Sequence, residues 1–333
     1  MEAGAEEVEV ALPRDLIRRP ATPLVALHGV DSVHELLAGR MVKVRAVSLE
    51  KLAPSTPKPK RGSYDGVRAG GILKAGWLEK HTNKAPAATA ALIEWAAADG
   101  GEGALAKVVA EIAATRQHFA SRGQARVVIV LVAASPVLED VEQRYALVVQ
   151  RASLDPRLAS LLVTETDIAL RFGAERLEGL LLSEARAFFE GAAAWSRKVL
   201  ETLSPQSQAE LIIRHGVKLA FYTEIADPGA PALKEYLTAY KDLSELAAFV
   251  PADRHPEVKS VAELLACKVC SLTLASSPPA DAHSSLLRHL SLYKDFAGPP
   301  SAAFIHLAWL ARQVTYPPWK LLQTGTILNH FRA

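Results

Sequence analysis

The stretch RVVIVLVA, residues 126–133, decides the fold of the first half of the chain. Its run of Val, Ile and Leu is rich in β-branched side chains, which favour strands. Because no polar residue interrupts the run, both faces of the predicted strand must be covered by other elements, as in a parallel sheet. The apolar run from Val127 to Ala134 is also too short to cross a bilayer as a helix.

Further apolar runs and helical patterns alternate around this strand. We expect strands over residues 23–28, 41–49, 89–95 and 160–164, and helices over residues 32–39, 104–121 and 136–153. In the second strand, Val42 and Val44 alternate with two basic residues, which is the period of a strand. Strands that alternate with helices at this spacing indicate right-handed crossover units and a parallel sheet. Asp31 is expected to cap the first of these helices.

Strand patterns stop after residue 166, and helical patterns fill the rest of the chain. We expect six helices, over residues 168–203, 207–226, 230–249, 257–274, 281–296 and 301–314. The short turns between them, rich in Pro, Gly and Ser, are typical of stacked helical hairpins. One hairpin resembles a tetratricopeptide unit, because small and aromatic residues fall where such helices pack. Its residues are Lys218, Ala220, Tyr222, Ala232, Tyr236, Ala239 and Tyr240.

The predicted fold class is therefore an α/β N-terminal domain, with a mostly parallel sheet and flanking helices, followed by an all-α, tetratricopeptide-like solenoid of helical hairpins. We divide the chain into a disordered acidic N-terminus at residues 1–15, an α/β domain at 16–166 with a basic Pro-rich loop at 50–71, a solenoid at 167–314, and an irregular tail at 315–333.

The composition is typical of a globular protein of a reducing compartment. Of 333 residues, 50% are apolar and 22% are charged, which is enough to form a sizeable core. The two cysteines provide no disulfide framework. The acidic N-terminus lacks the cationic region of a signal peptide, so we expect a cytosolic protein that meets membranes only peripherally.

The segment KRGSYDGVRAGGILKAGWLEKH, residues 60–81, stands out by its charge. Between Arg40 and Lys84 there are eleven Lys or Arg and three Asp or Glu, an excess of eight positive charges in a chain of net charge +2. Such a segment with one indole predicts a surface that meets an acidic partner or docks into an assembly. The alternative is a solvated loop followed by a short helix whose Leu73 and Trp77 pack inward. Both interpretations stay open here.

The motifs of common catalytic sites are absent from the sequence. There is no GxxxxGK[ST] phosphate loop, no complete dinucleotide fingerprint and no GxSxG nucleophile elbow. Cys267 and Cys270 form a CxxC, but zinc needs four ligands and no second pair lies nearby, so we interpret them as small residues in a helix interface. We therefore expect no catalytic residue, no metal ligand and no cofactor.

An enzyme in the α/β half, binding a small molecule or nucleotide, is the alternative function. Open parallel sheets bind ligands at the carboxyl ends of their strands. The residues expected there are Glu94, Ala134, Ser135, Thr164 and Glu165. Nucleic-acid binding ranks last and we expect no such partner, because the charge excess is local and few aromatic residues accompany it.

A second block, RHGVKLAFYTEIADPGAPALKEYLTAYKDL at residues 214–243, joins the basic segment in a family resemblance. In their order and separation, the two blocks resemble the foie gras family, the N-terminal part of subunit eleven of the transport protein particle (TRAPP) tethering complex. Weaker similarity, including the ARVVIVLV and LLVTE strands and the helix around Cys267, extends it over residues 15–312. Family members are longer, so the chain is similar to an N-terminal portion or to a shortened gene model, and residues 315–333 do not match.

The resemblance implies a non-catalytic scaffold subunit. The complex activates a Rab-type GTPase by nucleotide exchange through other subunits, tethers vesicles in transport from the endoplasmic reticulum to the Golgi, and is linked to autophagy. The implied partners are other TRAPP subunits and, indirectly, the GTPase, at a cytoplasmic site peripheral to Golgi and intermediate membranes. The basic segment from Arg40 to Lys84 is expected to face anionic lipid or an acidic partner. The residues expected to make interactions are Lys60, Arg61, Tyr64, Lys74, Trp77, Lys80, His81, Arg214, Lys218 and Tyr222.

Overall fold

The structure is a computed structural model that describes residues 21–52, 72–73, 77–95, 101–121, 126–133, 141–294, 296, 300 and 303–315. The chain divides into two compact units. The sheet unit consists of the described residues of Thr22–Lys58 and Leu78–Phe189. The helical unit consists of the described residues of Met1–Ala21, Pro59–Trp77 and Glu190–Ala333. The domain boundaries drawn from the sequence stay a prediction.

The sheet unit is built on five parallel strands in the order β2-β1-β3-β4-β5. The strands are β1 Leu24–His28, β2 Arg45–Ser48, β3 Ala88–Glu94, β4 Val127–Ala133 and β5 Ala159–Val163. β4, which contains the apolar run, pairs with β3 on one side and β5 on the other. The predicted parallel sheet is confirmed.

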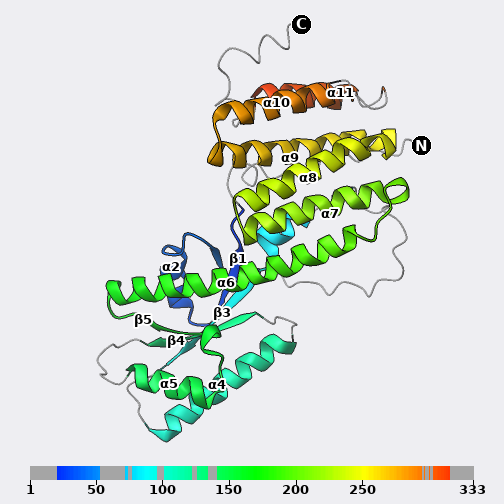
Figure 1. Ribbon diagram of the computed structural model, residues 1–333. Helices are drawn as coiled ribbons and strands as arrows, with labels where there is room; N and C mark the ends of the chain where they lie inside the picture. The colour runs from blue at the N-terminus through cyan, green and yellow to red at the C-terminus, as the bar shows by residue number, and fades with distance from the viewer. Residues whose placement is uncertain are drawn as a thin grey trace, which may run out of the picture. The chain divides into compact units, whose positions relative to one another are not determined.

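Helices cover both faces of this sheet, as the apolar run predicts. They are α2 Asp31–Ala38, α4 Glu102–Ser121, α5 Val141–Arg151 and α6 Asp167–Leu200. In β4, Val128 and Val130 lie in a core with α2 and α6, whereas Ile129 and Leu131 lie in a core with α4 and α5. Figure 1 shows α4 and α5 on one side of the sheet and α6 on the other.

The ends of some elements differ from the predicted ones. β2 begins at Arg45 and not at residue 41, and Val42 is 79% exposed, so the alternating pattern there overestimated the strand. Asp31 is not the cap of α2, because the N-cap is Val30 and Asp31 lies in the first turn. A carboxylate at that place still interacts favourably with the helix dipole.

Short helices connect several of the longer elements. They are η1 Leu49–Lys51, α3 Trp77–Glu79, η2 Lys80–Lys84, η3 Pro156–Leu158, η4 Ala247–Phe249 and η5 Ala252–Arg254.

The helical unit contains the end of α6 and further helices that pack against one another. They are α7 Pro205–Ala226, α8 Ala230–Leu246, α9 His255–Ser276, α10 Pro279–Tyr293 and α11 Ala303–Thr315. α7 contacts α8, α8 contacts α9, and both α10 and α11 contact α9 (Figure 1). One apolar core runs through α7 to α11. The predicted helical region after the sheet is confirmed, and the name of its repeat stays a prediction.

Turn residues mark the ends of these helices as the sequence indicates. Four helices carry a proline in their first turn, where its missing N–H costs nothing: Pro205, Pro231, Pro256 and Pro279. Gly229, between α7 and α8, has a φ of 129°, a conformation that glycine adopts without a steric penalty.

Candidate interaction site

The predicted interaction residues fall into three groups. Lys60, Arg61, Tyr64 and Lys74 lie outside the described residues. Trp77, Arg214, Lys218 and Tyr222 belong to the helical unit. Lys80 and His81 belong to the sheet unit.

Arg214 holds the backbone of Ile72 inside the helical unit. Its Nε donates a hydrogen bond to the carbonyl oxygen of Ile72 at 2.6 Å, and the N–H of Ile72 donates to Oε2 of Glu257 at 2.7 Å. Arg254 donates from Nη2 to the same carboxylate oxygen at 3.0 Å. The side chains of Ile72 and Leu73 are 0% and 7% exposed and belong to the apolar core. Because buried peptide groups need hydrogen-bond partners, Arg214 anchors this segment.

Trp77 packs on α7 one to two helical turns after Arg214, at Lys218, Phe221 and Tyr222. Its indole Nε1 donates to the hydroxyl oxygen of Tyr222 at 3.3 Å. The ring meets Phe221 edge-on with centroids 5.3 Å apart, and Tyr222 in the same way at 5.8 Å. Nζ of Lys218 lies 5.7 Å from the centroid of the indole, within the range of a cation–π interaction. Trp77, Lys218 and Tyr222 therefore form one cluster.

The two sequence blocks that carry the family resemblance thus contact each other. Ile72 and Trp77 come from the first block, and Arg214, Lys218 and Tyr222 come from the second. Leu73 is buried and Trp77 is half-buried, so the inward-packing interpretation of these two side chains is confirmed. Burial raises the pKa of the Tyr222 phenol, although the hydrogen bond from Trp77 lowers it in part, so the phenol is neutral at physiological pH.

Lys80 and His81 lie in η2 of the sheet unit. His81 is 8% exposed, and its imidazole meets the ring of Phe189 edge-on with centroids 6.1 Å apart. Lys80 is half-buried. His81 therefore takes part in packing within the sheet unit.

A buried ion pair in the helical unit was not predicted. Nζ of Lys268 on α9 lies 2.7 Å from Oε1 of Glu224 on α7, and the two residues are 3% and 1% exposed. The hydroxyl of Tyr236 donates to the other oxygen of Glu224 at 2.6 Å, and the N–H of Ala21 donates to Oε1 at 3.2 Å. The one available signal was a lysine inside the apolar stripe of α9, whose partner is 44 residues away.

Cys267 and Cys270 are free, buried thiols in the core of the helical unit. Burial raises the pKa of both, that of Cys270 to about 12. Sγ of Cys270 lies 3.5 Å from the carbonyl oxygen of Ala282 on α10. Since the thiols stay protonated and packed, their interpretation as small residues in a helix interface is confirmed.

The residues expected to form an enzyme site at the carboxyl ends of the strands are not brought together in the part of the chain that the structure describes. Ala134 and Ser135 lie outside the described residues. Thr164 donates to the carbonyl oxygen of Ala133 at 3.3 Å, while Glu94 and Glu165 are exposed. A cavity of about 440 Å³ is lined instead by α5, by the segment that follows it and by Arg176 of α6. Its lining includes residues that precede β5, next to the amino end of that strand, whereas open α/β sheets bind ligands at the carboxyl ends.

Within the part of the chain that the structure describes, none of the helices combines the length and the apolar character needed to cross a membrane.

Two family models match the chain. Residues 67–169 match the trafficking protein particle complex subunit 11 N-terminal domain, and residues 254–316 match the foie gras liver health family 1. The first range covers β3, β4 and β5, and the second covers all of α9, α10 and α11. The strands of the expected weaker similarity and the helix around Cys267 fall within these ranges.

Three curated relatives, each named trafficking protein particle complex subunit 11, are similar to most of the chain. The Gallus gallus protein is 27% identical over 321 residues, which is 91% of this chain and 28% of the relative. The Bos taurus and Homo sapiens proteins are each 28% identical over 262 residues, which is 77% of this chain and 23% of the relative. The chain thus spans about a quarter of the length of the curated relatives it matches.

The Gallus gallus match, over 91% of the chain, extends across both contacting blocks, whereas the two family-model ranges leave out residues 214–243. The resemblance drawn from the blocks is confirmed: the chain is similar to the N-terminal, foie gras-containing part of trafficking protein particle complex subunit 11.

Proposed function

We propose that this chain supplies a non-catalytic scaffold region of a TRAPP-type vesicle-tethering complex. Its similarity to relatives named as subunits of the trafficking protein particle complex carries the proposal. In this role it binds other subunits and supports nucleotide exchange on a Rab-type GTPase indirectly. The place of action is the cytoplasmic face of Golgi and intermediate membranes, in transport from the endoplasmic reticulum to the Golgi and in autophagy.

The helical unit provides surface for such contacts. Phe304 and Leu307 on α11 are 62% and 65% exposed and lie three residues apart, on one face of the helix. Large apolar side chains at this exposure are typical of protein–protein contacts when they lie together. We propose that this face of α11 contributes to subunit binding.

Co-purification tests the proposal. The tagged full chain is expressed in cells and isolated, and TRAPP subunits are quantified by mass spectrometry beside the double variant Phe304→Ser/Leu307→Ser. Removal of two central apolar contacts lowers recovery about tenfold or more. The matched control is Phe172→Ser on α6, a side chain of similar exposure (66%) in the sheet unit. A folded wild-type chain that recovers no TRAPP subunit overturns the proposed function.

The basic segment is proposed to meet anionic lipid. Lys60, Arg61, Tyr64, Lys74 and Lys80 stay candidates for this contact. At roughly 1 kcal/mol per well-placed cation, the attraction depends strongly on salt. Sedimentation with anionic and neutral vesicles at several salt concentrations tests it, and equal binding to both vesicle types at every salt concentration contradicts it.

A further inference from the structure

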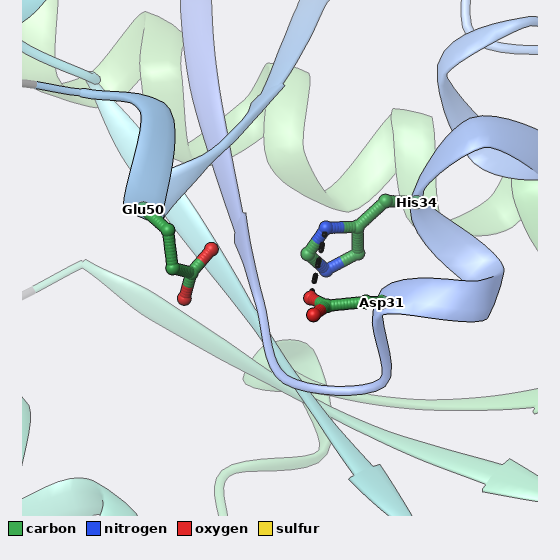
Figure 2. A group of neighbouring side chains, drawn as sticks. All are labelled: Asp31, His34 and Glu50. Carbon is green, nitrogen blue, oxygen red and sulfur yellow. Dashed lines mark ion pairs between the residues drawn. The ribbon is translucent and has the colours of Figure 1, made fainter.

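A separate group of polar side chains lies where β1 and β2 end in the sheet unit. Asp31 and His34 belong to the first turn of α2, which follows β1, and Glu50 belongs to η1, which follows β2. One ring nitrogen of His34 and one carboxylate oxygen from each acid all lie within 4.8 Å of one another. Figure 2 shows the three side chains converging from two separate segments of the chain.

The topology of the sheet places this group where α/β proteins bind ligands. The order β2-β1-β3-β4-β5 changes direction between β1 and β3, and ligands bind beyond the carboxyl ends of strands at such a point. Many sheets of this kind carry a glycine-rich loop there for phosphate. At this place the chain has the carboxylates of Asp31 and Glu50, and their negative charge repels a phosphate and attracts a cation.

The imidazole of His34 is buried in this group without the hydrogen bonds that it needs. The residue is 8% exposed, and its Nε2 has no hydrogen-bond partner among the described residues. Its Nδ1 lies 3.6 Å from Oδ1 of Asp31, which is longer than a good hydrogen bond. Leaving a buried polar group unpaired costs about 1–3 kcal/mol. Coordination of a cation by a ring nitrogen removes a cost of this kind.

Glu50 is held in a fixed orientation by residues around it. Nδ1 of His28 lies 2.9 Å from its Oε1, and the hydroxyl of Ser48 donates to its Oε2. The ring of His28 packs in turn edge-on against Phe119 at 5.4 Å and stacks on His118 at 5.9 Å. Hydrogen bonds that orient a ligand carboxylate are a regular feature of metal sites.

We propose that Asp31, His34 and Glu50 bind a divalent transition-metal ion, with Zn²⁺ as the preferred ion. One imidazole nitrogen with two carboxylate oxygens suits Zn²⁺, whereas Mg²⁺ and Ca²⁺ take oxygen ligands. Three protein ligands leave the fourth tetrahedral position to water.

The distances between the ligand atoms of Asp31, His34 and Glu50 allow these side chains to close around a metal ion. Ligand atoms about 2.1 Å from a tetrahedral Zn²⁺ lie roughly 3.4 Å from one another. The atoms of this group, within 4.8 Å, must therefore approach by little more than 1 Å. The side chain of Asp31 is 87% exposed, so packing does not prevent it from rotating by that amount toward His34 and Glu50.

The competing explanation is local helix stabilisation. Asp31 in the first turn of α2 interacts favourably with the helix dipole without any metal. That explanation predicts that removing the carboxylate lowers stability to the same extent with and without Zn²⁺. The metal site predicts, in addition to any such loss, a further loss that appears only when Zn²⁺ is present.

The experiment measures binding of Zn²⁺, Co²⁺ and Mg²⁺ to the full chain after treatment with EDTA, by isothermal titration calorimetry. We expect one Zn²⁺ per chain at this site and no comparable binding of Mg²⁺. Glu50→Gln and Asp31→Asn, which preserve side-chain size, each lower the affinity for Zn²⁺ at least tenfold. Glu35→Gln removes an exposed carboxylate from the same helix and serves as the matched control, with unchanged affinity.

Two further readouts separate this site from others. The Co²⁺ complex shows visible d–d bands without a thiolate charge-transfer band, which excludes binding at Cys267 and Cys270. Thermal unfolding in EDTA and in Zn²⁺ gives a Zn²⁺-dependent rise in Tm that Glu50→Gln abolishes. The proposal is overturned if folded wild-type chain binds no Zn²⁺, or if Asp31→Asn and Glu50→Gln bind it as tightly as Glu35→Gln does.

Discussion

The ammonium of Lys268 and the carboxylate of Glu224 lie 2.7 Å apart between α9 and α7, where water does not reach either group. Together with the hydroxyl of Tyr236 and the N–H of Ala21, they satisfy one another's hydrogen bonds. Taking either partner away leaves a charge in the interior, which costs far more than the intact pair contributes.

Lys268→Met therefore lowers the free energy of unfolding by about 3–5 kcal/mol, because Glu224 then stays buried without its cation. Adding Glu224→Gln recovers most of this loss, since the amide carbonyl still accepts the hydrogen bond from Tyr236. Urea unfolding followed by circular dichroism measures both variants. A loss below 1 kcal/mol in Lys268→Met would mean that the pair is not buried as described.

Trp77 and Tyr222 are expected to be energetically coupled. Trp77→Phe keeps the ring contact with Phe221 but loses the donor to Tyr222, and Tyr222→Phe loses the acceptor, so each costs about 1 kcal/mol. The double variant costs less than the sum, with a coupling of about 0.5–1 kcal/mol. A double-mutant cycle by urea unfolding measures the coupling, and additive losses contradict the contact.

Alanine substitutions at two glycines of the sheet unit are expected to change stability in opposite directions. Gly29 has a φ of 82°, and a Cβ added there would lie 2.2 Å from the carbonyl oxygen of Leu92, so Gly29→Ala destabilises by at least about 2 kcal/mol. Gly179, inside α6, has open space around it, so Gly179→Ala stabilises by about 0.5–1 kcal/mol. Thermal unfolding compares the two, and a neutral Gly29→Ala would contradict the close approach of β1 and β3.

The stability of the helical unit falls at alkaline pH. The thiol of Cys270 has a pKa of about 12 in the folded chain, above its ordinary value of 9. Its contribution to stability is complete below pH 9 and is lost as pH rises toward 12, because only the unfolded chain releases the proton in that window.

Cys270→Ala removes this titration. Its unfolding free energy declines less steeply than that of the wild type between pH 9 and 11, by up to about 1.4 kcal/mol per pH unit. Urea unfolding in the presence of a reductant, at pH values from 7 to 11, measures both slopes. Equal slopes throughout this range would show that the thiol is not buried.

The local sequence predicted the elements well where packing follows directly from composition. The apolar run of β4 requires cover on both faces, and the prolines of α7 to α10 mark helix starts. The prediction failed at residues 41–44, where alternation continues although these residues lie outside β2. Alternation reports a half-buried strand only when a neighbour is available for pairing.

Contacts between residues far apart in the sequence could not be predicted from local sequence patterns. Arg214 binds the peptide carbonyl of Ile72, 142 residues away, and every residue offers the same carbonyl group, so no side chain in the sequence marks the partner. The group formed by Asp31, His34 and Glu50 was missed for a related reason. Glu50 lies 19 residues after Asp31 and 16 after His34, on another segment, and only the pairing of β1 with β2 brings it to them.

The docking of Ile72 and Leu73 into the core of the helical unit has a consequence for dissecting this chain. A fragment that starts at Glu190 would lack both side chains and the peptide group that joins Arg214 to Glu257. It would expose an apolar slot and remove one hydrogen-bond partner from Arg214 and one from Glu257, although Glu257 keeps its contact with Arg254. Autonomous folding of the C-terminal half therefore requires that the peptide of residues 59–77 be supplied, either in the same polypeptide or by complementation in trans.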